Sequence, residues 1–257
     1  KMLYFATAGY LGETTGNIPY GNITGYMVKH LPYFLRKKLV LPAGVYNISD
    51  VNKRTKTIAV LALKNNITQI GFFAPIEALL FFEYIEKNRE ELTAIIAKKN
   101  KRRAKYLEAL PNFKLISIWP KLAMINCVKT SSTEFYLEQL YKKIGKKIIT
   151  KDPGIYASEG RINLGIVDDD KAGVIVANTN FFEFCELSQT STKTFKEPIS
   201  IDKIKQGRKY KVLLTTTEGL YRYDLGDIVE VVGFRKKLPV VKFFDRDNYI
   251  NIIGENM

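Results

Sequence analysis

One acidic side chain stands in a setting that could bind a sugar. Residues 217–229 read Thr-Glu-Gly-Leu-Tyr-Arg-Tyr-Asp-Leu-Gly-Asp-Ile-Val, between a β-rich run at 210–216 and a second one at 228–234. This order predicts that Asp227 is exposed where the chain leaves a tight turn. Because a carboxylate accepts hydrogen bonds at both oxygens, it can hold the two vicinal hydroxyls of a ribose. The alternative is a plain hairpin in which Gly226 and Asp227 only form the turn.

Three further segments carry residue types suited to binding. Residues 154–160 read Gly-Ile-Tyr-Ala-Ser-Glu-Gly and residues 178–184 read Asn-Thr-Asn-Phe-Phe-Glu-Phe, each after a strand-like run. Residues 119–120, Trp-Pro, close an earlier run. In this order the segments resemble the GH3 family of acyl-acid amido synthetases, a branch of the adenylate-forming ligases. The resemblance runs over nearly the whole chain, from residues 16–20 to residues 254–255.

The resemblance implies chemistry on ATP. Such enzymes join a carboxylate to the α-phosphate of ATP and release pyrophosphate, with Mg²⁺ as the metal ion. By resemblance, Tyr156 borders the adenine, Ser158 donates to the α-phosphate and Glu159 helps to hold Mg²⁺, which prefers hard oxygen ligands. Ser158 and Glu159 are therefore the catalytic candidates, and Glu159 is the metal candidate. The alternative for this segment is a strand end at which Ser and Glu cap a helix.

Asp227 and two arginines complete the expected nucleotide site. By resemblance, Asp227 binds the ribose hydroxyls. Arg222 stays charged and could pair with Asp227, Asp224 or phosphate, or form a structural ion pair that only orients the loop. Residues 242–246, Lys-Phe-Phe-Asp-Arg, resemble the family's Phe-x-x-Arg stretch and make Arg246 a second candidate. The family often has Gly where this stretch has its Asp.

The acid substrate has weaker candidates. The loop at 16–25 occupies the family position that borders the acyl acid, which implies substrate contacts from Tyr20 and Thr24. Aromatic side chains at such positions can equally serve packing. His30 is the only histidine and has no matched acid or nucleophile in the sequence, so we expect an ordinary surface or boundary residue, which argues against a histidine-based hydrolase.

Two parts of the superfamily's site have no counterpart in the sequence. Members carry a Ser/Thr/Gly-rich phosphate loop that ends in Lys, and residues 12–16 imitate it without that Lys. Members also use a lysine of a small C-terminal domain, which the resemblance places after the last residue. The chain begins at Lys1 rather than at a methionine. We therefore expect a fragment of the large N-terminal domain that is inactive alone.

Composition restricts the other classes of function. The 257 residues carry a formal net charge of +14 at pH 7, which allows nucleic-acid binding. Apart from a run at 98–105 the basic residues are dispersed, and no nucleic-acid motif accompanies them, so we expect no nucleic acid among the partners. No apolar stretch is long enough to span a membrane, and the first residues do not read as a charged-then-apolar leader, so we expect neither a membrane partner nor export. Cys127 and Cys185 fit buried thiols of a cytoplasmic protein.

The elements that must position these residues indicate an α/β fold. We expect mixed β-sheets with covering helices, in one incomplete adenylation-type domain. Residues 1–112 would form a helix-rich, acyl-side portion and residues 113–257 a sheet-rich, nucleotide-side portion. The expected strands are 2–6, 66–73, 115–118, 123–128 and 148–150. The expected helices are 27–38 (interrupted by Pro32), 51–64, 75–87, two within 90–110, and 133–144. Residues 168–170, three aspartates, fit an exposed turn better than a metal site.

The functional prediction is ATP-dependent activation of a small carboxylic acid, followed by transfer to an amine, for which an amino acid is the first candidate. One alternative keeps the fold and transfers the acyl group to a thiol such as coenzyme A. A second is a nucleotide-binding remnant without catalysis. A third is a basic nucleic-acid-binding protein whose resemblance to the family is coincidental. The identity of the acid and the oligomeric state are not encoded in any motif.

Overall fold

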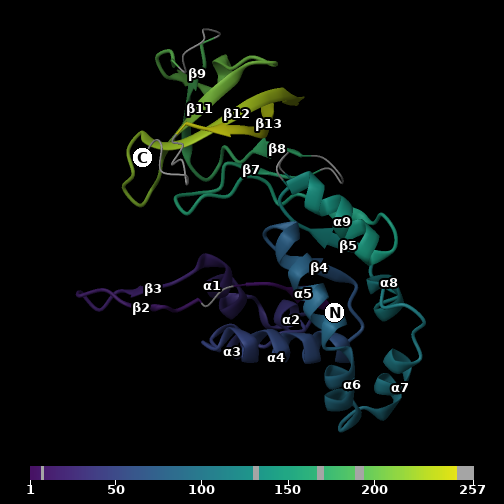
Figure 1. Cartoon of the computed structure of the whole chain (residues 1–257). Coiled ribbons are helices and arrows are strands. Elements are labelled where there is room, and N and C mark those ends of the chain that lie inside the picture. Colours follow the sequence, from purple (N-terminus) through teal and green to yellow (C-terminus); the bar gives the residue numbers. More distant parts are fainter. Residues whose placement is uncertain (7–8, 130–132, 167–170, 189–193, 248–257) are drawn as a thin grey trace, which may run out of the picture. The chain divides into compact units, whose positions relative to one another are not determined.

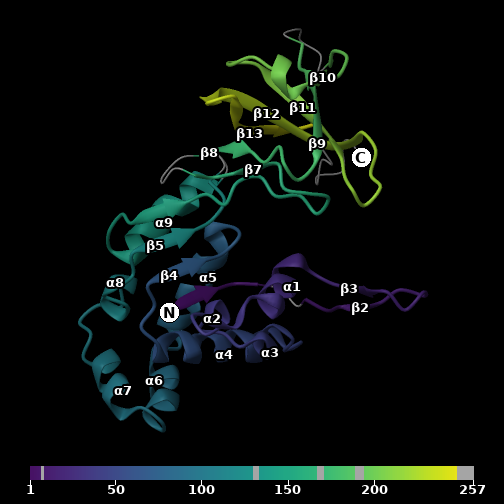
Figure 2. The ribbon, with the colours of Figure 1, turned by 180° about the vertical axis from the view of Figure 1, so that it is seen from behind.

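The chain folds as two units, each with its own sheet and core. The structure is a computed structural model that describes residues 1–6, 9–129, 133–166, 171–188 and 194–247. The contacts divide the chain into Lys1–Thr150 and Lys151–Met257 (Figures 1 and 2). The boundary expected at residues 112 and 113 lies inside the first unit. That both units belong to one incomplete adenylation-type domain stays a prediction. The aspartates at 168–170 and the residues at 254–255 lie outside the described residues.

A four-stranded sheet runs through the first unit in the order β1-β4-β5-β6. Its strands are β1 (Met2–Tyr4), β4 (Gln69–Gly71), β5 (Met124–Asn126) and β6 (Ile149–Lys151). β1 pairs with β4 and β4 with β5 in parallel, an arrangement that needs crossover connections. A separate hairpin joins β2 (Gly12–Glu13) and β3 (Pro19–Tyr20).

Helices supply those crossovers. They are α1 (Ile23–His30), α2 (Tyr33–Arg36), α3 (Ala43–Tyr46), α4 (Val51–Lys64), α5 (Pro75–Lys87), α6 (Arg89–Ala97), α7 (Lys101–Glu108), α8 (Leu115–Ile118) and α9 (Glu134–Ile144). Local signals set several of their ends. The Asp50 carboxylate accepts the N–H of Lys53 at 2.9 Å at the start of α4, and Pro75 opens α5. Gly145, with φ 98°, ends α9 in the left-handed conformation.

The expectations for strands and helices are mostly confirmed, with one clear error. The strand expected at 115–118 is the helical turn α8, in which Leu115 and Ile118 are buried one turn apart. A four-residue apolar run is compatible with a strand or with a helical turn. Here the helical turn forms because it buries both apolar side chains on one face. β5 and β6 are neighbours as expected. Leu140 of α9 joins the same core as Ile125 of β5.

The second unit is a seven-stranded sheet of order β10-β9-β11-β12-β13-β8-β7 with antiparallel pairing. Its strands are β7 (Asn163–Leu164), β8 (Ala172–Ile175), β9 (Phe181–Glu186), β10 (Ile199–Ser200), β11 (Lys209–Thr215), β12 (Tyr223–Arg235) and β13 (Leu238–Arg246), and a 3₁₀ helix, η2, spans Ile201–Lys203. Alternate residues of β11 are buried, so one face of the sheet forms the core. Cys127 and Cys185 are buried thiols that form no disulfide, as expected.

Candidate functional site

A tight hairpin presents Ser158 and Glu159. The N–H of Ala157 donates to the carbonyl of Gly160 at 3.1 Å, and the N–H of Gly160 donates back at 3.3 Å. Ser158 and Glu159 form the two-residue tip between them; Ser158 is exposed and Glu159 is partly buried. The chain continues into β7, so the alternative of a helix capped by these residues is wrong.

The base of this hairpin is anchored to the sheet. Asn163 is fully buried; its Oδ1 accepts the N–H of Ile155 at 2.6 Å and its Nδ2 donates to the carbonyl of Val241 at 2.8 Å. Tyr156 is 46% exposed, and the Arg161 guanidinium lies 5.5 Å from the centre of its ring. One ring face is thus next to a cation.

Asp227 lies in a bulge of β12. One residue of β11, Val212, faces three of β12, because Lys211 is opposite Ile228 while Leu213 is opposite Asp224. Gly226, at the centre of the bulge, has φ 72°, which glycine adopts readily. The expectation that Asp227 is exposed at a turn is wrong: the turn is at residues 216–220, and Asp227 is only 8% exposed within the strand.

Charges from two other segments act on Asp227. Arg246 is opposite Asp227 in the β12–β13 register, with its Nε 3.6 Å from Oδ1 of Asp227. Burial raises the pKa of the Asp227 carboxyl, Arg246 lowers it in part, and the negative charge of Glu159 raises it further. Asp227 is therefore within electrostatic reach of both Arg246 and Glu159.

Arg222 has a different partner from those expected. Its Nε and Nη2 donate to the two carboxylate oxygens of Glu183, at 2.8 and 2.6 Å, so pairing with Asp227 or Asp224 is wrong. Hydrogen bonding to Arg222 lowers the pKa of the Glu183 carboxyl. Arg222 also has φ 45°, an uncommon conformation for a residue with a side chain. The bidentate pair fits the role of an orienting ion pair.

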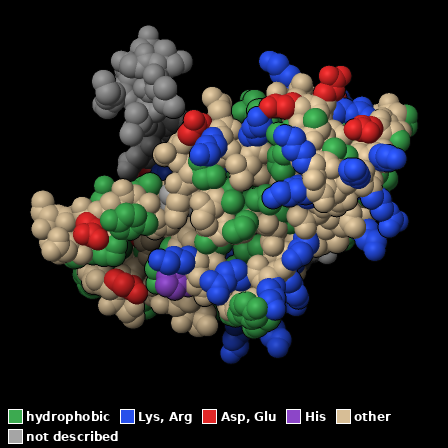
Figure 3. Space-filling model, turned by 90° about the horizontal axis from the view of Figure 1, so that it is seen from below, with side chains coloured by type: hydrophobic (Ala, Val, Ile, Leu, Met, Phe, Trp, Pro, Cys, Tyr) green, Lys and Arg blue, Asp and Glu red, His purple; other side chains and the backbone are tan. Residues whose placement is uncertain are grey.

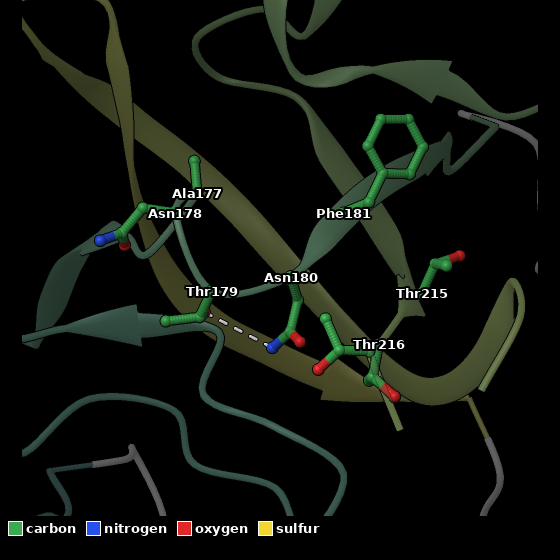
Figure 4. A pocket seen from close by; sticks show the side chains of 8 residues that line it. Ala177, Asn178, Thr179, Asn180, Phe181, Thr215 and Thr216 are labelled. Carbon is green, nitrogen blue, oxygen red and sulfur yellow. Dashed lines mark hydrogen bonds between the residues drawn. The ribbon is translucent and has the colours of Figure 1, made fainter. Parts of the chain in front are cut away.

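A pocket beside the hairpin was not expected from the sequence. It has a volume of about 400 Å³ and is lined by the segments 177–181 and 215–217 (Figure 4). A Cβ on Gly160 would lie 2.7 Å from Nδ2 of Asn180, so the hairpin lies against one of the residues that line this pocket. The lining is neutral, with threonine hydroxyls, two asparagines and the exposed ring of Phe181. In the sequence, the run of three threonines at 215–217 could have indicated this pocket.

Tyr20 and Thr24 belong to the first unit. Tyr20 is in β3, is 52% exposed, and its hydroxyl lies over Gly12, where an added Cβ would be 2.9 Å away. Thr24 is exposed in the first turn of α1. His30 is exposed at the end of α1 and its ring lies 4.1 Å from that of Tyr26.

Glu159 is the residue predicted to hold a metal ion. Among the residues that the structure describes, no three His, Cys, Asp or Glu side chains gather in a way that could hold a metal ion. Mg²⁺ is often held by one or two carboxylates together with substrate phosphates. The partly buried Glu159 fits that pattern, with phosphate oxygens as the other ligands. Every helix in the described ranges falls short of the length and apolar character of a membrane span.

Known proteins match both units. The model for the GH3 family N-terminal domain matches residues 1–103 and 89–149, and that for the GH3 family central domain matches residues 173–246. The indole-3-acetic acid-amido synthetase GH3.10 of Arabidopsis thaliana is 32% identical over 155 residues, which are 55% of this chain and 26% of that protein. The jasmonoyl-L-amino acid synthetase JAR4 of Nicotiana attenuata is 28% identical over 62% of this chain and 27% of its own length.

A solved structure shares the fold. The GH3.15 acyl acid amido synthetase superposes with a TM-score of 0.79 at 18% identity, over 98% of this chain and 50% of that one. The chain thus spans half of that solved protein, and smaller shares of the curated relatives. Because the family models cover residues from both units, the chain belongs to the GH3 family.

Proposed function

We propose that the full-length protein activates a small carboxylic acid with ATP, as an acyl adenylate, and transfers the acyl group to an amino acid. One observation carries this proposal. β12 presents Asp227 from a bulge, in the same unit that carries the hairpin-tip carboxylate of Glu159, whose charge is one of the influences that raise the pKa of Asp227. A nucleotide needs two such acidic groups close together: one for its ribose and one for the metal ion at its phosphates.

Each residue then has a defined part. Asp227 accepts hydrogen bonds from the ribose hydroxyls, and Arg246 next to it favours the charged carboxylate. Ser158 donates to the α-phosphate, and Tyr156 borders the adenine. Glu159 would help to hold Mg²⁺, and the bound ion would supply positive charge that neutralises the phosphates.

Other residues support this arrangement. Arg222 orients the loop before β12 through Glu183, and Tyr20 and Thr24 contact the acid. The roles of Tyr20 and Thr24 follow the family resemblance, whereas the orienting role of Arg222 follows from its ion pair with Glu183.

The relatives' names support the choice of acceptor. GH3.10 is named as an indole-3-acetic acid-amido synthetase, JAR4 as a jasmonoyl-L-amino acid synthetase and GH3.15 as an acyl acid amido synthetase. One GH3.15 structure contains 2,4-DB, an acid. We therefore favour an amine acceptor over a thiol, and we place the reaction in the cytoplasm, where buried thiols stay reduced.

Exchange of labelled pyrophosphate into ATP tests the first half-reaction. The assay uses the full-length protein and a panel of small aromatic and aliphatic acids, and it does not require knowledge of the amine. We expect exchange that depends on one class of acid and on Mg²⁺. If no acid supports exchange while Asp227→Ala leaves MgATP binding unchanged, the proposal is wrong.

Replacement of Glu159 should separate metal use from binding. Because Glu159 is assigned to the metal at the phosphates, Glu159→Ala should lower Mg²⁺-dependent exchange by about a hundredfold, with a smaller loss of nucleotide affinity. Glu197→Ala removes an exposed carboxylate of the same unit and should leave both quantities unchanged. Equal losses of exchange and of affinity in Glu159→Ala would contradict the metal role.

A further inference from the structure

The bulge that presents Asp227 is held at its central peptide. The N–H of Gly226 donates to Oδ1 of Asp224 at 2.8 Å. On its other side, the carbonyl of Gly226 accepts the N–H of Asp247 at 2.7 Å. Both contacts come from aspartates, one before the bulge and one after the end of β13. The orientation of the Gly226 peptide sets the direction of the next side chain, Asp227. This direction therefore depends on the hydrogen bonds that Gly226 makes with Asp224 and Asp247.

One cation joins the two aspartates. The Lys211 ammonium on β11 lies 2.9 Å from Oδ2 of Asp224 and 3.0 Å from Oδ2 of Asp247. Its side chain is only 15% exposed, and its ammonium lies 4.1 Å from the centre of the Phe195 ring. Burial by itself would lower the pKa of Lys211, but the hydrogen bonds to the two carboxylates outweigh it and the pKa is raised. The group therefore stays charged at neutral pH.

Lys211 also occupies the right position along the sheet. It is opposite Ile228, the residue that follows Asp227 and closes the bulge. Both oxygens of Asp224 are used, one for Gly226 and one for Lys211. Two other lysines of this unit each pair with a single carboxylate outside the bulge: Lys196 with Glu186 and Lys242 with Glu230.

We infer that Lys211 is a positioning residue for Asp227: by joining Asp224 to Asp247 it holds the Gly226 peptide, and with it the direction of the Asp227 carboxylate. This inference rests on the proposed function, in which Asp227 binds the ribose. Lys211 itself touches no nucleotide in this scheme. Its removal should therefore weaken recognition of the ribose hydroxyls selectively, without a general loss of affinity.

The test compares two nucleotides in the full-length protein. Dissociation constants for ATP and 2′-deoxy-ATP, measured by calorimetry at fixed Mg²⁺, give a ratio that reports the contact between Asp227 and the 2′-hydroxyl. We expect wild type to prefer ATP by about tenfold, since hydrogen bonds to charged groups are strong. Asp227→Ala should bring the ratio close to one. Lys211→Met should lower it at least threefold, with little change for 2′-deoxy-ATP.

Three variants make the result decisive. Lys211→Arg keeps a cation between the aspartates and should retain most of the preference. Lys196→Met removes the same charge from an exposed ion pair and should behave as wild type. Should Lys211→Met fail to fold, Asp247→Asn takes its place, because it loses the ion pair and keeps the N–H that bonds to Gly226.

The outcomes separate the two claims. The positioning role of Lys211 is overturned if folded Lys211→Met prefers ATP over 2′-deoxy-ATP as strongly as wild type does. The same result in Asp247→Asn overturns it when that variant is the substitute. An Asp227→Ala variant that keeps the preference for ATP overturns the ribose assignment on which the inference rests, whereas acid-dependent pyrophosphate exchange tests the proposed function itself.

Discussion

Asp227 keeps its charge in a place that disfavours it. Burial and the nearby Glu159 raise the pKa of its carboxyl, and Arg246 offsets this only in part. A carboxyl whose pKa is higher in the folded chain than in the unfolded chain binds its proton more tightly when folded. The free energy of unfolding therefore falls as the pH rises through that pKa. This carboxylate lowers stability at neutral pH, as expected for a residue that serves binding.

Asp227→Asn should separate stability from binding. At pH 7 we expect a Tm equal to or slightly above that of wild type, because a neutral amide is less costly to bury. Nucleotide affinity should fall about ten- to a hundredfold. The difference in Tm should disappear as the pH is lowered through the pKa of Asp227, where the wild-type residue also becomes neutral.

Asp202→Asn is the matched control for this prediction. Asp202 is exposed, and the hydrogen bond that it accepts from Ser200 lowers the pKa of its carboxyl. This shift is opposite in direction to that of Asp227. Its replacement should not raise the Tm and should leave nucleotide affinity unchanged. A Tm several degrees below wild type for Asp227→Asn at pH 7 would show that the ionised carboxylate stabilises the fold.

At the scale of elements, the bulge of β12 depends on Gly226. Its φ of 72° is strained for any residue with a side chain, so Gly226→Ala should cost about 1–2 kcal/mol of stability. Because a straighter strand would turn Asp227 away, nucleotide affinity should fall as well. Urea unfolding and calorimetric titration measure the two effects.

A second glycine of the same strand serves as the control. Gly233 does not have a positive φ, and a Cβ there would have no atom within 4 Å. Gly233→Ala should therefore be neutral or slightly stabilising. Similar losses in both variants would mean that glycine in β12, rather than the bulge, is what matters.

Sequence reasoning succeeded where the signals were local. Asp50 and Pro75 set the starts of α4 and α5 through contacts within one helical turn, so they could be recognised from a few residues. Sequence reasoning failed where a residue distant in the sequence determines the local structure or the ion pair. The bulge at Asp227 exists only in the register of β12 against β11, and Glu183, the partner of Arg222, is 39 positions away. The sequence was sufficient to identify the candidate site residues, but not to predict which residues they contact.

At the scale of the whole molecule, the positive charge is dispersed. Lys and Arg side chains occur at many places on the face in Figure 3, among hydrophobic and neutral ones. We expect random duplex DNA to bind weakly and to dissociate as salt rises from 50 to 200 mM, whereas MgATP binding should change little. Fluorescence anisotropy with labelled DNA checks this.

The basic run at 98–105 offers a control for the DNA measurement. Lys101 and Arg102 are exposed at the start of α7. Replacing both by Gln should weaken the DNA signal and leave nucleotide affinity unchanged. Tight DNA binding that persists at 200 mM salt would instead favour a nucleic-acid-binding protein.

The two separate hydrophobic cores have a consequence for cooperativity. All buried members of one core lie between Leu3 and Ile148, and those of the other between Ile162 and Val241. Elements that share no core need not melt together, so heating should give a calorimetric enthalpy larger than the van't Hoff enthalpy. A nucleotide bound by the second unit would then raise the temperature of one transition only. The melting profile would report which half of the chain holds the ligand before any residue is changed.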